Sequence, residues 1–199
     1  LHKNDLPDGL SLGPHVAVDT ETLGLNTVRD RLCLVQLSAG DGTAHLVQLA
    51  RDHYEAPNLK RLLSDPAVLK LYHFARFDLA AIRRYLGVLA GPVYCTRTAS
   101  KLARTYTDKH GLKDLVKELL DVDLSKQQQS SDWGAENLSE QQLAYAANDV
   151  AFLHRLKEAL DRMLMREGRM ALAQACFDFL PARAELDLAG WGEGDIFAH

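Results

Sequence analysis

The sequence predicts one α/β domain, spanning residues 1–199, in which a mixed β-sheet carries α-helices on its faces. The chain is 47% hydrophobic, which is enough for one sizeable core. Its first quarter has three short apolar segments separated by polar turns, the pattern of an antiparallel meander. Strand-like and helix-like segments then alternate, as in layered α/β proteins. We expect a core at about residues 15–165 and a C-terminal helix and tail at 170–199.

The meander begins where an apolar run from His15 leads to two carboxylates, Asp19 and Glu21. Polar residues that include Asn26 separate this run from the second strand, and a turn at 39–43 precedes the third. Leucines at helical spacing follow, and another apolar run comes after them. We therefore expect strands at residues 15–21, 31–38, 44–49 and 67–72, and a helix at 57–64.

The second half of the chain is predicted to be mainly helical, with one short buried strand at 92–95. Ser139 is followed three residues later by Gln142, which is the pattern of a capping box at a helix start. Gly168 is expected to end that helix. The predicted helices are 77–86, 98–106, 112–120, 139–167 and 170–180.

Charge and cysteine content narrow the possible functions. A net charge of -4 disfavours a protein that follows a long nucleic-acid backbone through many Lys and Arg contacts, so we expect a short contact or one made through cations. The three cysteines are far apart without C-x-x-C spacing, which disfavours disulfides and zinc. No segment resembles a membrane helix or a signal peptide. We expect a cytoplasmic protein with no membrane partner.

Four carboxylates carry the predicted chemistry. Asp19 and Glu21, in the stretch VDTETLGL, point to the same face of a strand and would repel each other. Asp78 opens a helix directly after a strand, a placement that a helix N-terminus alone would also favour. Asp149 shares a helix face with Tyr145 and with apolar neighbours, where an acid is costly unless it is paired. Such oxygen ligands suit two Mg²⁺ or Mn²⁺ ions, whose charge would remove the repulsion.

The motifs DTE, HFARFD and YAAND, in this order and spacing, resemble the tyrosine branch of the DEDD 3'-to-5' exonucleases, the ribonuclease D group. Ala144 stands where the histidine branch has its His. The resemblance covers about residues 15–165 and implies a ribonuclease H-like fold. Longer segments, HFARFDLAAI, PVYCT, RTYTDKHGLKDLVKELL, SKQQQSSDWG and DIFAH, resemble the nano-RNase C group of diribonucleases.

This resemblance implies a role for each acid. Asp19, Glu21, Asp78 and Asp149 would hold two divalent cations, Mg²⁺ or Mn²⁺, with Asp19 between them. Tyr145 would orient the attacking water, and the product would be a nucleoside 5'-monophosphate. The resemblance also implies a homo-oligomer, an octameric ring in related proteins. The apolar tail from Leu186 onward would then pack against a neighbouring subunit.

Further residues are candidates for substrate contacts. Leu23 either wedges against the terminal bases or packs in the core. His73, where the ribonuclease D pattern has Asn, either contacts ribose or phosphate or completes a strand end. The segment around Trp133 resembles a segment of ribonuclease D whose polar groups suit phosphate and sugar. Trp133 itself either stacks on a base or anchors its loop. The candidates in that segment are Lys126, Gln129, Ser131 and Trp133.

Basic residues are concentrated between Arg97 and Lys117. They form either a solvated helix face or a patch that captures the 5'-phosphate of a dinucleotide, for which Arg104 and His110 are the candidates. The expected function is metal-dependent 3'-to-5' hydrolysis of very short RNA, diribonucleotides above all. The alternatives are a general ribonuclease D-like enzyme that trims tRNA or longer RNA, and a catalytically inactive nucleic-acid-binding module.

Overall fold

The computed structural model describes residues 1–124, 131–194 and 196–199. Its strands form one mixed sheet in the order β1-β4-β3-β2-β5-β6. β2, β3 and β4 pair antiparallel, whereas β2–β5, β5–β6 and β1–β4 pair parallel. The predicted meander and mixed sheet are therefore confirmed. The strands are β1 (His2–Lys3), β2 (His15–Thr22), β3 (Leu32–Ser38), β4 (His45–Gln48), β5 (Leu69–Tyr72) and β6 (Val93–Cys95).

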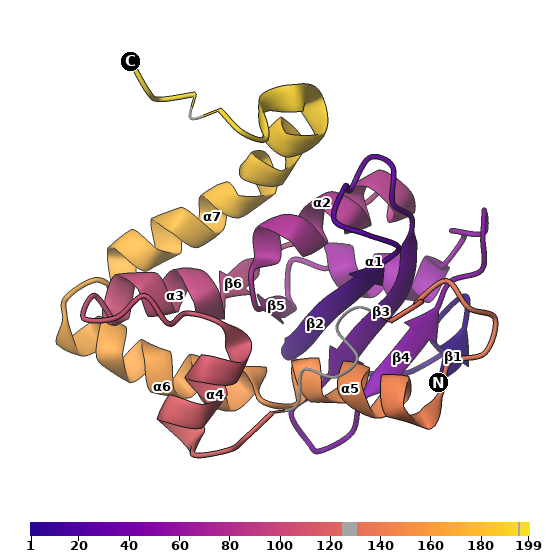
Figure 1. The fold of residues 1–199 in the computed structure, drawn as a ribbon, viewed down its shortest axis with the longest axis horizontal. Helices are drawn as coiled ribbons and strands as arrows, with labels where there is room; N and C mark the ends of the chain where they lie inside the picture. The colour runs from indigo at the N-terminus through magenta and orange to yellow at the C-terminus, as the bar shows by residue number, and fades with distance from the viewer. Residues whose placement is uncertain (125–130, 195) are drawn as a thin grey trace.

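Helices cover both faces of the sheet, and for this reason every residue of β3 is buried. α5 packs across β2, β3 and β4, and α2 packs against β2, β3, β5 and β6 (Figure 1). α3 and α7 both contact α6, which also supports α4. The helices are α1 (Pro57–Ser64), α2 (Ala75–Leu86), α3 (Thr96–Ala103), α4 (Leu112–Leu120), α5 (Glu140–Ala151), α6 (Leu153–Arg166), α7 (Met170–Leu186) and a π-helical turn, η1 (Asp187–Trp191).

Several boundaries differ from the sequence prediction. The helix expected over 139–167 is broken at Phe152 into α5 and α6. α5 packs mainly against β3, whereas α6 packs mainly against α3 and α4. α7 continues through Pro181 to Leu186, past its expected end. β1 is two residues long, too short for a periodic signal to predict it. The capping box is confirmed, because Ser139 accepts from the Gln142 N–H and the Gln142 side chain accepts from the Ser139 N–H.

Three elements bring the candidate residues to one region of the sheet. β2 carries Asp19 and Glu21, and the register between β2 and β3 shifts at Glu21 and Thr22. The junction from β5 to α2 carries His73 and, in the first turn of the helix, Asp78. α5, which packs across β2, β3 and β4, carries Tyr145 and Asp149. Of the helices within the described residues, none is long and apolar enough to cross a membrane.

Candidate active site

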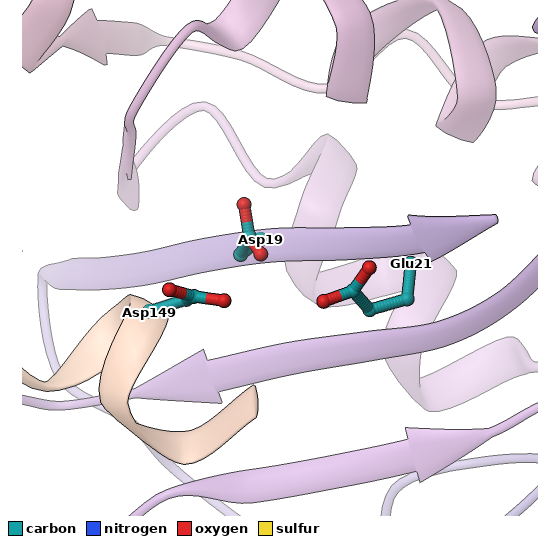
Figure 2. Close-up of side chains that lie close together, drawn as sticks. All are labelled: Asp19, Glu21 and Asp149. Atoms are coloured by element: carbon teal, nitrogen blue, oxygen red, sulfur yellow. The ribbon is translucent and has the colours of Figure 1, made fainter. Parts of the chain in front are cut away.

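Asp19, Glu21 and Asp149 form an acidic cluster. Each offers a carboxylate oxygen, and these oxygens lie within 4.8 Å of one another. Figure 2 shows Asp19 and Glu21 on β2, with Asp149 approaching from α5 so that its carboxylate faces the other two. Residues 128 positions apart in the sequence are therefore neighbours in the fold, since Glu21 and Asp149 belong to the same cluster.

Local structure holds these side chains in place. Alternation along β2 puts Asp19 and Glu21 on the same face of the sheet. Gln36, opposite Asp19 on β3, donates from its side-chain amide to the Asp19 carboxylate at 3.2 Å. Asp149 is placed by α5, whose Ala146 packs in a small apolar cluster with Leu34 and Trp133. The acids therefore stand on a buried, packed base.

Asp78 lies beside this cluster. Its side chain is only 3% exposed and accepts a hydrogen bond of 2.6 Å from the Thr20 hydroxyl. Thr20 lies between Asp19 and Glu21 in β2, so its side chain points to the opposite face of the sheet. Asp78 is nevertheless close enough for its charge to raise the pKa of Glu21, and for the charge of Asp19 to raise the pKa of Asp78.

The four acids are strongly destabilised as anions in the protein alone. Burial raises the pKa of Asp19 to about 7. Burial, and then the charge of Asp19, raises the pKa of Asp149 to about 8. The same causes raise the pKa of Asp78 well above its ordinary value. Glu21 is affected most, because burial and the charges of the other three acids raise its pKa to about 10.

This donor set fits hard divalent cations. Mg²⁺ and Mn²⁺ prefer carboxylate oxygens, and the oxygens here converge within bonding reach of one small volume. A cation would also supply the positive charge that the described residues do not place within the cluster, since Gln36 offers it only a neutral amide. Burial is the first cause of the raised pKa values of Asp19 and Glu21, and a nearby cation would favour their ionised forms.

Tyr145 lies one helical turn before Asp149, to which its hydroxyl donates a hydrogen bond. Burial and the charges of Asp149, Glu21 and Asp19 raise its pKa above the ordinary value of a tyrosine. The hydroxyl therefore stays protonated at neutral pH. Its ring lies 6.2 Å from the Trp133 ring, centroid to centroid. Tyr145 can thus orient a reacting group as a hydrogen-bond donor, but it is a poor base.

The cluster opens into a cavity of about 420 Å³. Its lining includes Asp19, Glu21, Asp149 and Tyr145. It also includes Arg97 of α3 and Lys113 of α4. The cavity also reaches Gly111 and Leu112, at the N-terminus of α4, where no side chain caps the helix. The remaining lining residues are His73, Phe74 and Leu124.

Arg97 and Lys113 replace the basic residues that the sequence suggested. Arg104 is fully buried at the end of α3, where its guanidinium donates to Ser100 and the Lys109 carbonyl and pairs with Glu118. It is thus committed to holding the chain together and is not on the cavity wall. His110 is also buried, with its Nδ1 2.8 Å from the Ser100 hydroxyl. The proposed 5'-phosphate site at Arg104 and His110 is therefore wrong for this chain.

The other substrate candidates have mixed outcomes. Trp133 is 2% exposed and packs in the apolar cluster beneath Tyr145, so it anchors its loop and offers no face to a base. Leu23 is 53% exposed, which rules out ordinary core packing. It lies so close to Gly134 that a Cβ added to this glycine would meet the Leu23 Cδ2 at 2.6 Å. Ser131 is partly buried near the start of this loop. Lys126 and Gln129 lie outside the described residues.

Residues 4–165 match the model of a 3'-5' exonuclease family. The chain belongs to the 3'-5' exonuclease family. Curated relatives include ribonuclease D of Gluconacetobacter diazotrophicus, which is 39% identical over 157 residues, or 79% of this chain and 39% of that protein. The chain thus spans about two fifths of the length of this ribonuclease D relative.

Solved structures of this exonuclease family give a closer match. NrnC of Brucella melitensis bound to pGG is 58% identical with a TM-score of 0.97, over 100% of this chain and 97% of that one. The same protein with bound Mg²⁺ is 57% identical with a TM-score of 0.96, over the same shares of the two chains. The predicted ribonuclease H-like fold and the resemblance to the nano-RNase C group are both confirmed.

Proposed function

We propose that this exonuclease-family protein hydrolyses very short RNA from its 3' end, diribonucleotides above all, and releases nucleoside 5'-monophosphates. One observation carries the proposal: the acidic cluster and a basic wall, formed by Arg97 and Lys113, line a single cavity of about 420 Å³. The volume lies within the range of small-ligand sites, roughly 300–1,000 Å³. The solved structure of Brucella NrnC with pGG supports a ligand of this size.

The cofactors in this proposal are two divalent cations, Mg²⁺ or Mn²⁺. Asp19, Glu21 and Asp149 would hold them, with Asp78 beside them. When bound, such cations stabilise the entering and leaving oxygens of an in-line displacement at phosphorus. The Mg²⁺ in the Brucella NrnC structure supports this assignment. The chain itself holds the four acids close together, although this arrangement raises their pKa values.

The remaining residues position the substrate. The Tyr145 hydroxyl, held by Asp149, orients the water that attacks the phosphodiester. Arg97, Lys113 and the uncapped N-terminus of α4 attract the 5'-phosphate within the same cavity. The exposed side chain of Leu23 contacts a base without reading its identity. A short substrate would contact both the acidic cluster and these basic groups.

The experiment that tests this function is a time course with equal concentrations of 5'-phosphorylated RNAs of two, three, seven and twenty nucleotides. Each RNA is incubated with Mg²⁺ or Mn²⁺, and with EDTA as control. We expect the dinucleotide to disappear much faster than the others and EDTA to stop the reaction. Asp149→Asn should be inactive, whereas Asp52→Asn, which changes a 90% exposed carboxylate, should match the wild type.

Three outcomes would contradict the proposal. Degradation of the twenty-nucleotide RNA as fast as the dinucleotide would identify a general trimming enzyme like ribonuclease D. Absence of hydrolysis with every RNA and both metals would favour an inactive binding module. Full activity of Asp149→Asn would separate the activity from the acidic cluster.

The same proposal includes a homo-oligomer, an octameric ring by resemblance. Apolar side chains of the C-terminal segment support it, since Phe197 is 77% and Trp191 52% exposed. The segment is tied to its own chain at η1, where Arg76 pairs with Asp187, and Figure 1 shows it extending from there away from the sheet. Light scattering coupled to gel filtration measures the oligomeric state, and a monomeric mass at all concentrations would contradict the homo-oligomer. Cytoplasmic location stays a prediction.

A further inference from the structure

His73 occupies a position in the cavity that the four acids and Tyr145 leave unexplained. It follows the last residue of β5 and precedes α2, whose first turn carries Asp78. The imidazole lines the same cavity as Asp19, Glu21 and Arg97. Phe74, directly after it, has a left-handed backbone with φ of 69°. A non-glycine residue in this conformation is strained, so the junction is held in place by its surroundings.

The hydrogen bonds around Thr96 decide which ring nitrogen of His73 carries the proton. The Thr96 hydroxyl is fully buried and has one proton, which it donates to the Tyr72 carbonyl at 3.1 Å. The same oxygen lies 2.9 Å from His73 Nδ1. Because its proton is already used, the hydroxyl can only accept from His73. Nδ1 is therefore protonated, and Nε2 carries a lone pair.

The Nε2 atom is buried, and among the described residues it has no hydrogen-bond partner. Burial, and then the positive charge of Arg97, lowers the pKa of His73 to about 3, so the ring stays neutral. A buried acceptor without a partner is costly and requires an explanation. A ligand group that donates a hydrogen would satisfy it. A phosphate diester cannot, because its oxygens carry no hydrogen at neutral pH.

We propose that His73 Nε2 accepts a hydrogen bond from a ribose hydroxyl of the substrate. This inference rests on the proposed hydrolysis of short RNA at the same site. The other donors of a dinucleotide are base N–H groups, which differ among the four bases. A single acceptor can serve every RNA sequence only through a group that all ribonucleotides share, which is the sugar hydroxyl. If this hydroxyl is a 2'-hydroxyl, which DNA lacks, His73 also favours RNA over DNA.

The test compares four substrates with three proteins. The substrates are pApA, the same dinucleotide lacking the 2'-hydroxyl of one ribose or of the other, and pApA lacking the terminal 3'-hydroxyl. The proteins are the wild type, His73→Phe and His73→Asn. The phenylalanine retains a ring of similar shape but cannot accept, whereas the asparagine amide oxygen can. The value of kcat/KM is measured for each pair with Mg²⁺.

We expect the wild type to lose about tenfold in kcat/KM on one deoxy substrate, the size of one lost hydrogen bond. His73→Phe should lose a similar factor on pApA and no longer distinguish that deoxy substrate from pApA. His73→Asn should recover part of the difference. The deoxy substrate that shows this loss identifies the hydroxyl that donates to His73. If His73→Phe discriminates among the four as strongly as the wild type, the inference is wrong.

A second measurement does not depend on the variants folding. Nitrogen-15 NMR of the wild-type imidazole should show a protonated Nδ1 and an unprotonated Nε2, and pApA added in EDTA should shift the Nε2 resonance. A protonated Nε2 in the free protein would overturn the inference. Failure of the proposed function looks different, because the wild type would then hydrolyse none of the four dinucleotides. If the wild type hydrolyses the dinucleotides and His73→Phe loses the same factor in kcat/KM on all four substrates, only the role of His73 is refuted.

Discussion

Replacing Asp19 with asparagine is expected to stabilise the cation-free protein and to remove its response to divalent cations. Burial raises the pKa of Asp19 from 3.8 to about 7. The folded state therefore holds the protonated carboxyl more tightly than the unfolded chain does. That stabilisation is complete below a pH of about 4 and is lost as the pH rises through about 7.

The magnitude follows from the same values. One pKa unit corresponds to about 1.4 kcal/mol, so at neutral pH the ionised Asp19 costs about 4 kcal/mol relative to a neutral side chain of the same shape. The asparagine oxygen can still accept from Gln36, which lies 3.2 Å from the carboxylate. Little else changes in the packing. The variant should then exceed the wild type in free energy of unfolding by about 4 kcal/mol at neutral pH, and by little near pH 4.

Thermal unfolding in EDTA across this pH range measures the difference. For a chain of this size, about 4 kcal/mol raises the melting temperature by roughly 10 °C. With saturating Mg²⁺, the wild type should gain stability by mass action and the variant should gain little. Asp52→Asn is the matched control, because its carboxylate is 90% exposed and should change neither value. A variant no more stable than the wild type in EDTA at neutral pH, or a gain independent of pH, would refute this reasoning.

Three further outcomes are expected. Tyr145→Phe keeps the ring beside Trp133 but loses the hydroxyl. Steady-state kinetics on pApA should therefore show kcat lowered by about a hundredfold with KM nearly unchanged. A normal kcat would contradict the role of the hydroxyl in positioning the water. Arg97→Ala should weaken the binding of pApA, measured by calorimetry, about tenfold, but not the binding of ApA, which lacks the 5'-phosphate. The control Lys117→Ala changes a lysine already paired with Asp121 and Asp123 and should affect neither ligand. Equal weakening for both ligands in Arg97→Ala would contradict a phosphate contact. Arg104→Ala should lower the free energy of unfolding in urea by about 3 kcal/mol, because it empties a fully buried site and removes the hydrogen bonds to Ser100 and to the Lys109 carbonyl. Unchanged stability with lost RNA affinity would restore Arg104 as a substrate ligand.

Much of the fold and the acidic site could be predicted because the relevant patterns are local. Alternation along residues 15–21 predicted a strand with both acids on one face, and this is how β2 presents Asp19 and Glu21. Ser139 and Gln142 marked the start of α5, and helical spacing then joined Tyr145 to Asp149. These inferences need only the geometry of one strand or one helix, which the sequence determines over a few residues.

The basic wall required the tertiary structure. Arg97 and Arg104 belong to one basic stretch of sequence, and helical periodicity does not tell which of them faces the cavity. α3 ends at Ala103, so Arg104 turns inward to Ser100, the Lys109 carbonyl and Glu118, while Arg97 reaches the cavity from the first turn. Trp133 is similar, because its role depends on the apolar surface that β3 and α5 present to its loop.

By itself the sequence determined the order of most elements, the acids and the tyrosine that assemble, and the family to which they point. The tertiary structure alone decided which basic side chains line the cavity with those acids and which nitrogen of His73 is left without a partner. It also decided that Trp133 anchors its loop and that Leu23 is exposed. The physical reason is that spacing along a chain sets which side chains share a face, whereas burial and hydrogen-bond partners depend on the elements that pack against that face.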